Sequence, residues 1–319
     1  MTAPISQTPV HFLFPGHGSE RPNMTRGLYD TVDSFRKDLD QGLSLASDLL
    51  KTELRSFLFN DHVPDELARR QLSQTVIAQP VLFSTEYALA KLLQRHGIEP
   101  AGMLGHSVSE YVSACLAEVF SFETALEIVC KRGQLVQSLP EGSMLAVSLS
   151  ESEITPYLSD TITLGSTIAK EQCVVSGYPE SVYQLAMTLE TEGIETKPVQ
   201  VTRAFHSMML DRILDEFHDF VEEKTLSAPR RRFISGLDGE WIHAPDAQTA
   251  DYWTKQLRSP VRFYEGLTTL LNEGPATFLE VGKGTMLTGL VKAHPLSKNA
   301  PSCLNIIPAS YQATDEVNF

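Results

Sequence analysis

Residues 103–111 read MLGHSVSEY, with two apolar residues and a glycine before a serine and a helix-forming run after it. The pattern predicts a short strand at Met103 and Leu104, a sharp turn at Ser107 and a helix from Ser109 through Ala117. A strained turn in that context exposes the serine hydroxyl, so Ser107 is a candidate nucleophile. Ser109 stands where the G-x-S-x-G motif has its second glycine, and a serine there costs a little space without forbidding the turn. A chance G-x-S between a strand and a helix is common, so the motif needs a partner residue.

The sequence before this motif predicts a strand and a helix of the same domain. Val10 to Phe14 is an apolar run that ends in a tight turn rich in proline and glycine. From Val81 to Leu93 apolar residues recur at helical spacing, and a glycine and a proline then stop the helix. Strands and helices therefore alternate, as in an α/β domain.

Residues 144–203 have a different pattern. Short apolar strands and two helices follow one another in the order β-α-β-β-α-β, which is typical of ferredoxin-like domains. We therefore predict an α/β protein in which a large domain, residues 1–143 plus 204–319, carries a small ferredoxin-like insert, residues 144–203. The expected strands are Met144–Leu149, Thr161–Leu164, Cys173–Ser176 and Thr196–Val201, and the expected helices are Ser152–Leu158 and Pro179–Glu192.

Charge and composition exclude several classes of partner. The formal net charge of -14 makes the chain a poor fit for nucleic acid or an anionic membrane. Residues 230–232, three arginines, are either a local basic patch or a solvated turn. No stretch approaches the ~20 apolar residues that span a bilayer, and the N-terminus lacks a secretory signal. The four cysteines have no metal-ligand spacing, which is typical of free thiols in a reducing cytosol, so we expect a cytoplasmic protein without a metal site.

A serine nucleophile needs a base, and the chain has nine histidines. His206 follows the last expected strand of the insert, within the sequence Ala204-Phe205-His206-Ser207. A base at a domain junction would face the cleft, where ligands usually bind. A packed or capping histidine is the alternative interpretation.

Seven motifs in order along the chain resemble those of the malonyl-coenzyme A:acyl carrier protein transacylase family. The resemblance is strongest to the acyltransferase domains of modular polyketide synthases, and it covers nearly the whole chain. It implies an α/β-hydrolase-like large domain with a ferredoxin-like insert, in agreement with the pattern above. The motifs are FPGHGSE at 14–20, AQP at 78–80, GHSVSEY at 105–111, RGQLVQ at 132–137, AFHS at 204–207, QLRSPV at 256–261 and LEVGKG at 279–284.

The resemblance also implies roles for individual residues. Ser107 would attack a thioester carbonyl, and His206 would accept its proton and return it to the leaving thiol. A backbone carbonyl, at the position of Gln256, would orient the histidine. The backbone N–H groups of Val108 and His17 would form the oxyanion hole. The remaining match, Gln79 in the AQP motif, is expected to contact the substrate.

By the same resemblance, Arg132 would decide the class of substrate. Its guanidinium would bind the free carboxylate of a malonyl group in a bidentate pair, although a helix-surface arginine is the plainer interpretation. Phe205 matches the malonyl-selective pattern, because its ring would fill the space that a 2-methyl group needs. Val108 is also the branched apolar residue typical of malonyl selection. One methyl group is worth only ~1–3 kcal/mol of discrimination.

Three departures from the family pattern bear on the donor. Ser109 replaces a glycine, and Lys283 replaces a proline. In the insert, Ile168, Lys170 and Gln172 occupy the places of an N-x-P-x-Q motif, so only the glutamine is retained. Contacts to the substrate or to phosphopantetheine are therefore in doubt, and the donor could be an acyl carrier protein rather than malonyl-coenzyme A.

We expect no bound cofactor, coenzyme A thioesters as substrates, an acyl carrier protein as partner, and a monomer. The main alternative is a hydrolase that clears acyl chains from carrier proteins, which would share Ser107 and His206 without needing Arg132. A non-catalytic docking module, the alternative from another class, would need none of the three. The chain begins with methionine, and residues 306–310 resemble the linker after this domain in large synthases. We interpret it as a free-standing acyltransferase or an excised domain, with the carrier and pathway left open.

Overall fold

Two β-sheets organise the protein, whose computed structural model describes residues 8–60 and 63–307. The larger sheet has the strand order β2-β1-β8-β9, and all its pairings are parallel. Strands β2, β1 and β8 are largely buried, as expected for parallel strands covered on both faces. The bounds are β1 (Val10–Phe14), β2 (Gly102–Gly105), β8 (Thr277–Lys283) and β9 (Ser302–Ile307). Strand β9 takes up residues 306 and 307, which we expected in a linker; residues 308–310 lie outside the described residues.

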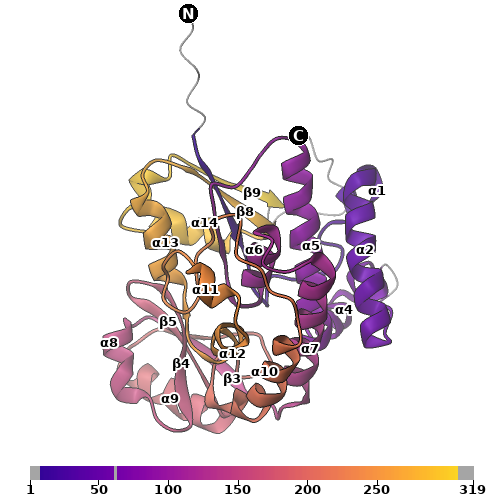
Figure 1. Ribbon diagram of the computed structural model, residues 1–319. Helices are drawn as coiled ribbons and strands as arrows, with labels where there is room; N and C mark the ends of the chain where they lie inside the picture. The colour runs from indigo at the N-terminus through magenta and orange to yellow at the C-terminus, as the bar shows by residue number, and fades with distance from the viewer. Residues whose placement is uncertain (1–7, 61–62, 308–319) are drawn as a thin grey trace, which may run out of the picture.

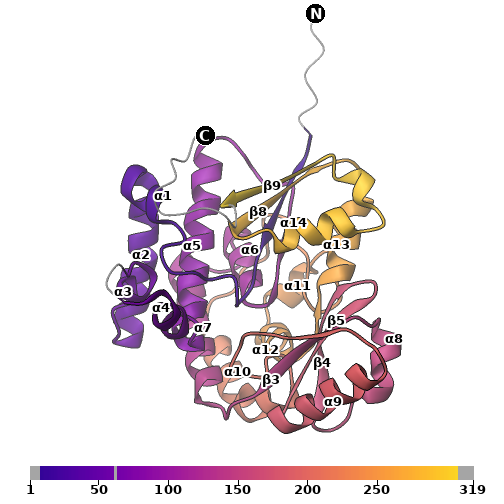
Figure 2. The same cartoon turned by 180° about the vertical axis from the view of Figure 1, so that it is seen from behind.

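Helices flank this sheet. Figures 1 and 2 show α2, α5 and α7 side by side on one flank, with α13 and α14 on the other. The helices of this part of the chain are α1 (Arg26–Thr31), α2 (Asp33–Leu50), α3 (Arg55–Leu58), α4 (Asp65–Leu72), α5 (Thr75–Arg95), α6 (Glu110–Leu116), α7 (Phe122–Ser138), α10 (Leu214–Glu222), α11 (Ala244–Ala247), α12 (Ala250–Arg258), α13 (Phe263–Asn272) and α14 (Met286–Ala293). Short 3₁₀ turns lie at Ser107–Ser109, Met208–Ile213 and Ser297–Asn299.

Helix α5 begins six residues before the helix expected from Val81, and it contains Pro80. Proline lacks an N–H and is normally excluded from a helix interior. Pro80 therefore makes the sequence predict a helix that starts only at Val81. Most of α5 is buried, with α2, α7 and β8 packed around it. Tertiary packing therefore outweighs the local cost of the proline.

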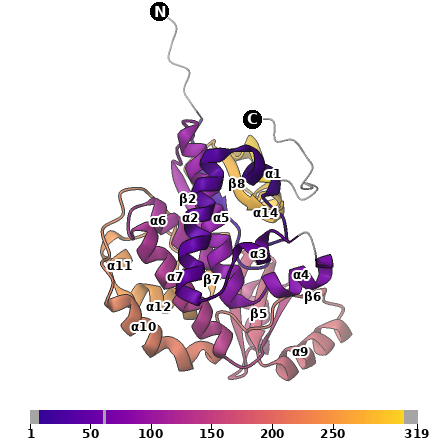
Figure 3. The same ribbon diagram turned by 90° about the vertical axis from the view of Figure 1, so that its right-hand side faces the viewer.

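The insert confirms the expected element order. Its strands follow one another in space as β6-β3-β5-β4, with antiparallel pairing throughout, and two helices complete the β-α-β-β-α-β pattern. The fold is therefore the predicted α/β class with a ferredoxin-like insert, which Figure 3 shows beneath the larger sheet with α9 at its outer edge. The elements are β3 (Ser143–Val147), α8 (Glu151–Ile154), a 3₁₀ turn (Thr155–Tyr157), β4 (Ile162–Ala169), β5 (Gln172–Gly177), α9 (Pro179–Thr191) and β6 (Thr196–Pro198). The residue bounds of the two domains stay a prediction.

A two-residue strand, β7 (Val261–Arg262), joins the small sheet from the larger domain. It pairs in parallel with β4, where Ser166 lies opposite Val261. The Ser166 hydroxyl donates to the Val261 carbonyl at 3.0 Å, and Arg262 forms an ion pair with Glu151. These contacts anchor to the insert the segment just before β7, which includes Ser259 of the candidate site described below.

The structure also bears on the expectations drawn from composition, namely the arginine cluster, the cysteines and the absence of a membrane span. The three arginines at 230–232 each pair with a glutamate, which favours the solvated turn over a basic patch. Three of the four free cysteines are buried, and Cys303 is half-buried. Within the described ranges, no helix combines the length and apolar character needed to cross a membrane.

Candidate active site

The backbone at Ser107 is strained in the way that a nucleophile elbow requires. Strand β2 ends at Gly105, and Ser107 follows with φ of +57°, a left-handed conformation that non-glycine residues rarely adopt. A Cβ at Gly105 would lie 2.3 Å from the backbone of Ser109, so only glycine fits there. The turn brings the Ser107 side chain into a cavity rather than into the core.

Ser107 and His206 form a hydrogen-bonded pair, although 99 residues separate them. Ser107 Oγ lies 2.7 Å from His206 Nε2, and His206 Nδ1 lies 2.8 Å from the carbonyl oxygen of Ser259. A carbonyl can only accept, so Nδ1 carries the proton and Nε2 is free to accept from the serine hydroxyl. The pair therefore has the arrangement of a nucleophile, a base and an orienting group.

The expectation that Gln256 supplies the orienting carbonyl is wrong, because that carbonyl belongs to Ser259. Gln256 lies inside helix α12, where carbonyls point along the helix axis. Ser259 caps the helix with ψ of 159°, which turns its carbonyl out of the helix. The Gln256 side chain lies behind the elbow instead and donates from Nε2 to the Ser107 carbonyl at 2.8 Å.

Burial keeps the His206 imidazole neutral. Desolvation, followed by the nearby charge of Arg132, lowers the pKa of His206 to about 3. An imidazole that stays unprotonated near neutral pH can accept a proton from Ser107 at any physiological pH.

Arg132 is fully buried, which rules out the helix-surface interpretation. It lies on helix α7 with Nη2 3.3 Å from Ser107 Oγ. Its Nε and Nη1 atoms have no hydrogen-bond partner among the described residues. Desolvation lowers its pKa, but an arginine remains charged. A buried guanidinium with unpaired N–H groups beside a nucleophile is suited to bind an anionic group of a substrate.

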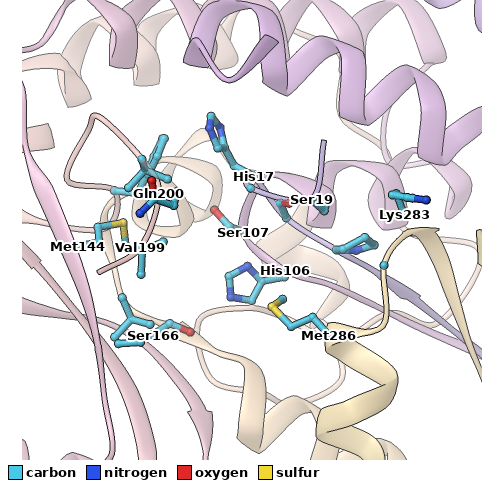
Figure 4. A pocket seen from close by; sticks show the side chains of 18 of the residues that line it. His17, Ser19, His106, Ser107, Met144, Ser166, Val199, Gln200, Lys283 and Met286 are labelled. Atoms are coloured by element: carbon cyan, nitrogen blue, oxygen red, sulfur yellow. Dashed lines mark hydrogen bonds between the residues drawn. The ribbon is translucent and has the colours of Figure 1, made fainter. Parts of the chain in front are cut away.

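A cavity of about 1080 Å³ surrounds the pair, between the elbow and the sheet of the insert. Figure 4 shows Ser107 near its centre, with His17 on one side and His106 on the other. The cavity collects most of the residues expected from the sequence: His17, Gln79, Ser107, Arg132, Phe205 and His206. The Gln79 amide is buried, and neither of its polar atoms has a partner within the described ranges, so it is available to a ligand.

Val108 and Gln256 do not line the cavity. The Val108 side chain is part of the main hydrophobic core, so its branched shape cannot contact an acyl group directly. Its main-chain N–H remains a candidate oxyanion donor, as does that of His17. The geometry of both donors toward a bound carbonyl stays a prediction.

A buried polar network centred on Glu110 lies behind the elbow, and the sequence does not predict it. Glu110 accepts hydrogen bonds from the Tyr252 hydroxyl, from Gln256 Nε2 at 3.1 Å and from the Gly236 N–H at 3.2 Å. The only sequence signal was the glutamate that follows the elbow, and nothing linked it to residues so far along the chain. Because Gln256 also holds the Ser107 carbonyl, the network fixes the strained turn from behind.

Glu110 should make stability depend on pH. Burial raises its pKa from 4.5 to about 7, so the folded state holds this proton more tightly than the unfolded chain does. The stability contributed by the protonated carboxyl is present below pH 4.5 and is lost as the pH rises through about 7. From about pH 5 to pH 8, the wild-type free energy of unfolding should fall by about 3 kcal/mol more than that of Glu110→Gln.

Urea denaturation at a series of pH values measures this difference. Glu118→Gln removes an exposed glutamate and should keep the wild-type slope. Parallel slopes for wild type and Glu110→Gln would show that Glu110 does not titrate in this range.

Comparisons with a protein family, with curated proteins and with solved structures all point to acyltransferase domains. The acyl transferase domain family matches residues 11–315. The chain is 34% identical over 293 residues to a phenolphthiocerol/phthiocerol polyketide synthase of Mycobacterium tuberculosis, covering 92% of this chain and 19% of that protein. The curated relatives are much longer proteins, of which the chain spans about a fifth or less.

Two solved structures extend the comparison. The acyl transferase domain of ZmaA superimposes with a TM-score of 0.88 and 34% identity, covering 97% of this chain and 72% of that one. An acyl carrier protein S-malonyltransferase from Vibrio cholerae gives a TM-score of 0.80 and 26% identity, covering 94% and 97%. Among the described residues, no group of three or more histidine, cysteine or acidic side chains could hold a metal ion.

Proposed function

Because the chain belongs to the acyl transferase domain family, we propose that it moves a malonyl group from coenzyme A to the phosphopantetheine thiol of an acyl carrier protein. It is an acyltransferase of the kind found in polyketide synthases and in carrier-protein malonyltransferases. The malonyl substrate, the carrier partner and the mechanism are our proposal.

In the first half-reaction, Ser107 Oγ attacks the thioester carbonyl while His206 Nε2 takes its proton. The carbonyl oxygen becomes an oxyanion, for which the N–H groups of His17 and Val108 are the proposed donors. The C–S bond then breaks, and His206 returns the proton to the departing thiolate. Acyl-Ser107 and free coenzyme A result.

The second half-reaction runs the same steps in reverse order with a different thiol. His206 removes the proton from the phosphopantetheine thiol, whose sulfur attacks the acyl-serine ester. The C–O bond breaks, and Ser107 recovers its proton from His206. The same base therefore serves both halves of a ping-pong reaction.

One observation carries the malonyl assignment: the Arg132 guanidinium lies next to Ser107 Oγ, buried, with two nitrogens unpaired. A malonyl group has a free carboxylate two bonds from its reacting carbonyl, and a guanidinium fork fits a carboxylate. Phe205 supports the assignment, because it lines the cavity with its ring 5.0 Å from the His17 ring and narrows the space beside the base.

The alternative is a hydrolase that releases acyl chains from carriers. It would use Ser107 and His206 but would not need an unpaired Arg132. The non-catalytic docking module is disfavoured by the aligned hydrogen bonds from Ser107 through His206 to Ser259, which a docking surface does not require.

Product analysis separates the transferase from the hydrolase. The protein would be incubated with malonyl-coenzyme A and a phosphopantetheinylated carrier protein, and mass spectrometry would quantify malonyl-carrier and free malonate. We expect malonyl-carrier as the main product. Free malonate in its place would assign the hydrolase function.

The donor, the location and the assembly state stay predictions. Ile168 lines the cavity where the family pattern has an asparagine, so a carrier protein remains the alternative donor. The expectations of a cytoplasmic monomer without a bound cofactor stand as proposed.

A further inference from the structure

Ser109 is the residue at which the elbow departs from its usual glycine. Its side chain is buried, and its hydroxyl donates to the carbonyl oxygen of Pro15 at 2.7 Å. Pro15 begins the loop that follows strand β1, 94 residues earlier in the chain. A glycine at position 109 could not make this bond, so the contact is a property of this sequence.

The loop that Ser109 binds carries His17. Its backbone packs directly on the elbow, because a Cβ at Gly16 would lie 2.6 Å from the His106 carbonyl. The His106 N–H also donates to the Phe14 carbonyl at 2.9 Å. The start of the loop and the nucleophile turn therefore form one packed unit.

Two hydrogen-bonding serines fix the two peptide planes before the His17 N–H. Ser109 holds the carbonyl of the Pro15–Gly16 peptide. Ser19 holds the carbonyl of the next peptide, with its N–H at 3.2 Å and its hydroxyl at 2.9 Å from the Gly16 oxygen. In a trans peptide the C=O and N–H groups point in opposite directions, so the bonds from Ser19 also aim the His17 N–H.

We propose that the Ser109 hydroxyl is a positioning group that holds the Pro15–Ser19 loop, and with it the His17 N–H, in place for the oxyanion. This inference rests on the proposed function, because it assigns a geometric role within that reaction. Ser109 does not line the cavity and acts only through the loop.

The surroundings of Ser109 leave its proton available for Pro15. The buried carboxyl of Glu86 lies beside the Ser109 hydroxyl, and burial raises the pKa of Glu86 well above its usual range. A neutral carboxyl does not compete as strongly as a carboxylate for the hydroxyl proton. Neither carboxyl oxygen of Glu86 has a hydrogen-bond partner among the described residues, so the Ser109 hydroxyl donates to Pro15 and not to this carboxyl.

The test compares Ser109→Ala with Ser113→Ala. Ser113 is a buried serine one helical turn further along α6, and its hydroxyl has no partner among the described residues, so its loss controls for removing a buried hydroxyl. Losing one positioning bond should lower kcat for acylation by malonyl-coenzyme A about tenfold. KM should be unchanged, because the oxyanion exists only in the transition state. Ser113→Ala should keep the wild-type kcat.

Hydrogen exchange gives a second readout that does not depend on activity. Amides in the peptide that covers residues 15–19 should exchange faster in Ser109→Ala than in wild type or Ser113→Ala. Ser109→Gly, the family residue, should reproduce both effects and serves if Ser109→Ala does not fold.

The outcomes separate this inference from the proposed function. If the wild type is not acylated at all, the proposed function fails. If the wild type is acylated, and Ser109→Ala and Ser109→Gly match Ser113→Ala in kcat and in exchange, only the positioning role is overturned. A fall in kcat with an equal rise in KM would also overturn it, since that pattern indicates general disruption of the cavity.

Discussion

His206→Ala should reduce the rate of Ser107 acylation by roughly 10³- to 10⁶-fold. The Nε2 atom that accepts the serine proton is 2.7 Å from Ser107 Oγ, and no second histidine bonds to this hydroxyl in the described structure. Stopped-flow release of coenzyme A measures the acylation step. Because the pKa of His206 is lowered to about 3, titration of this residue should not slow wild-type acylation as the pH falls from about 8 to about 5.

His218→Ala is the matched control. That histidine lies on the outer face of α10 and bonds to Asp251, away from the cavity. It should keep the wild-type rate. Acylation of His206→Ala within about tenfold of wild type would remove His206 from the role of base.

Arg132→Ala should invert the preference between malonyl and acetyl donors. The substitution leaves the malonyl carboxylate without a partner in a desolvated site, which typically costs ~3–5 kcal/mol, or roughly two to four decades in rate. Acetyl-coenzyme A has no carboxylate, so its transfer should be spared or improved. The measurement is the ratio of kcat/KM for the two donors in wild type and variant.

Two further variants sharpen this test. Arg132→Lys keeps the charge but loses the planar fork, so it should recover only part of the malonyl preference. Lys131→Ala removes the neighbouring cation, which pairs with Glu216 on the surface, and should leave the ratio unchanged. An unchanged ratio in Arg132→Ala would mean that the arginine is only structural, and Phe205 alone could not carry the malonyl assignment.

Much of the fold follows from local sequence. Strands β1 and β2 of the larger sheet and strands β3, β4 and β5 of the insert are mainly apolar runs bounded by glycine, proline or polar residues, so they are predictable from periodicity. Strands β8 and β9 are not among the strands that the sequence predicts. Strand β7 was not predictable, because two residues carry no pattern and their pairing with β4 depends on how the domains meet. The sequence predicts too short a helix α5, because Pro80 disfavours the first turns, which are stabilised by packing in the folded protein.

The residues of the site can also be separated into those that the sequence predicts and those that it does not. Ser107, His206 and Arg132 could be picked out because each sits in a motif, and the structure brings all three together. The orienting carbonyl could not be assigned, since Gln256 and Ser259 share one motif and only the helix end decides which carbonyl turns outward. Sequence alone also does not tell whether the Val108 side chain points into the cavity or into the core, and in the structure it lies in the core.

The central claim is that Ser107 carries the acyl group. Intact-mass measurement after incubation with malonyl-coenzyme A tests it most directly, with wild type and Ser107→Ala side by side. We predict a single added malonyl mass on the wild type, located at Ser107 by peptide mapping, and no adduct on Ser107→Ala. An adduct of equal size on Ser107→Ala, or a wild-type adduct that maps to another residue, would contradict the account.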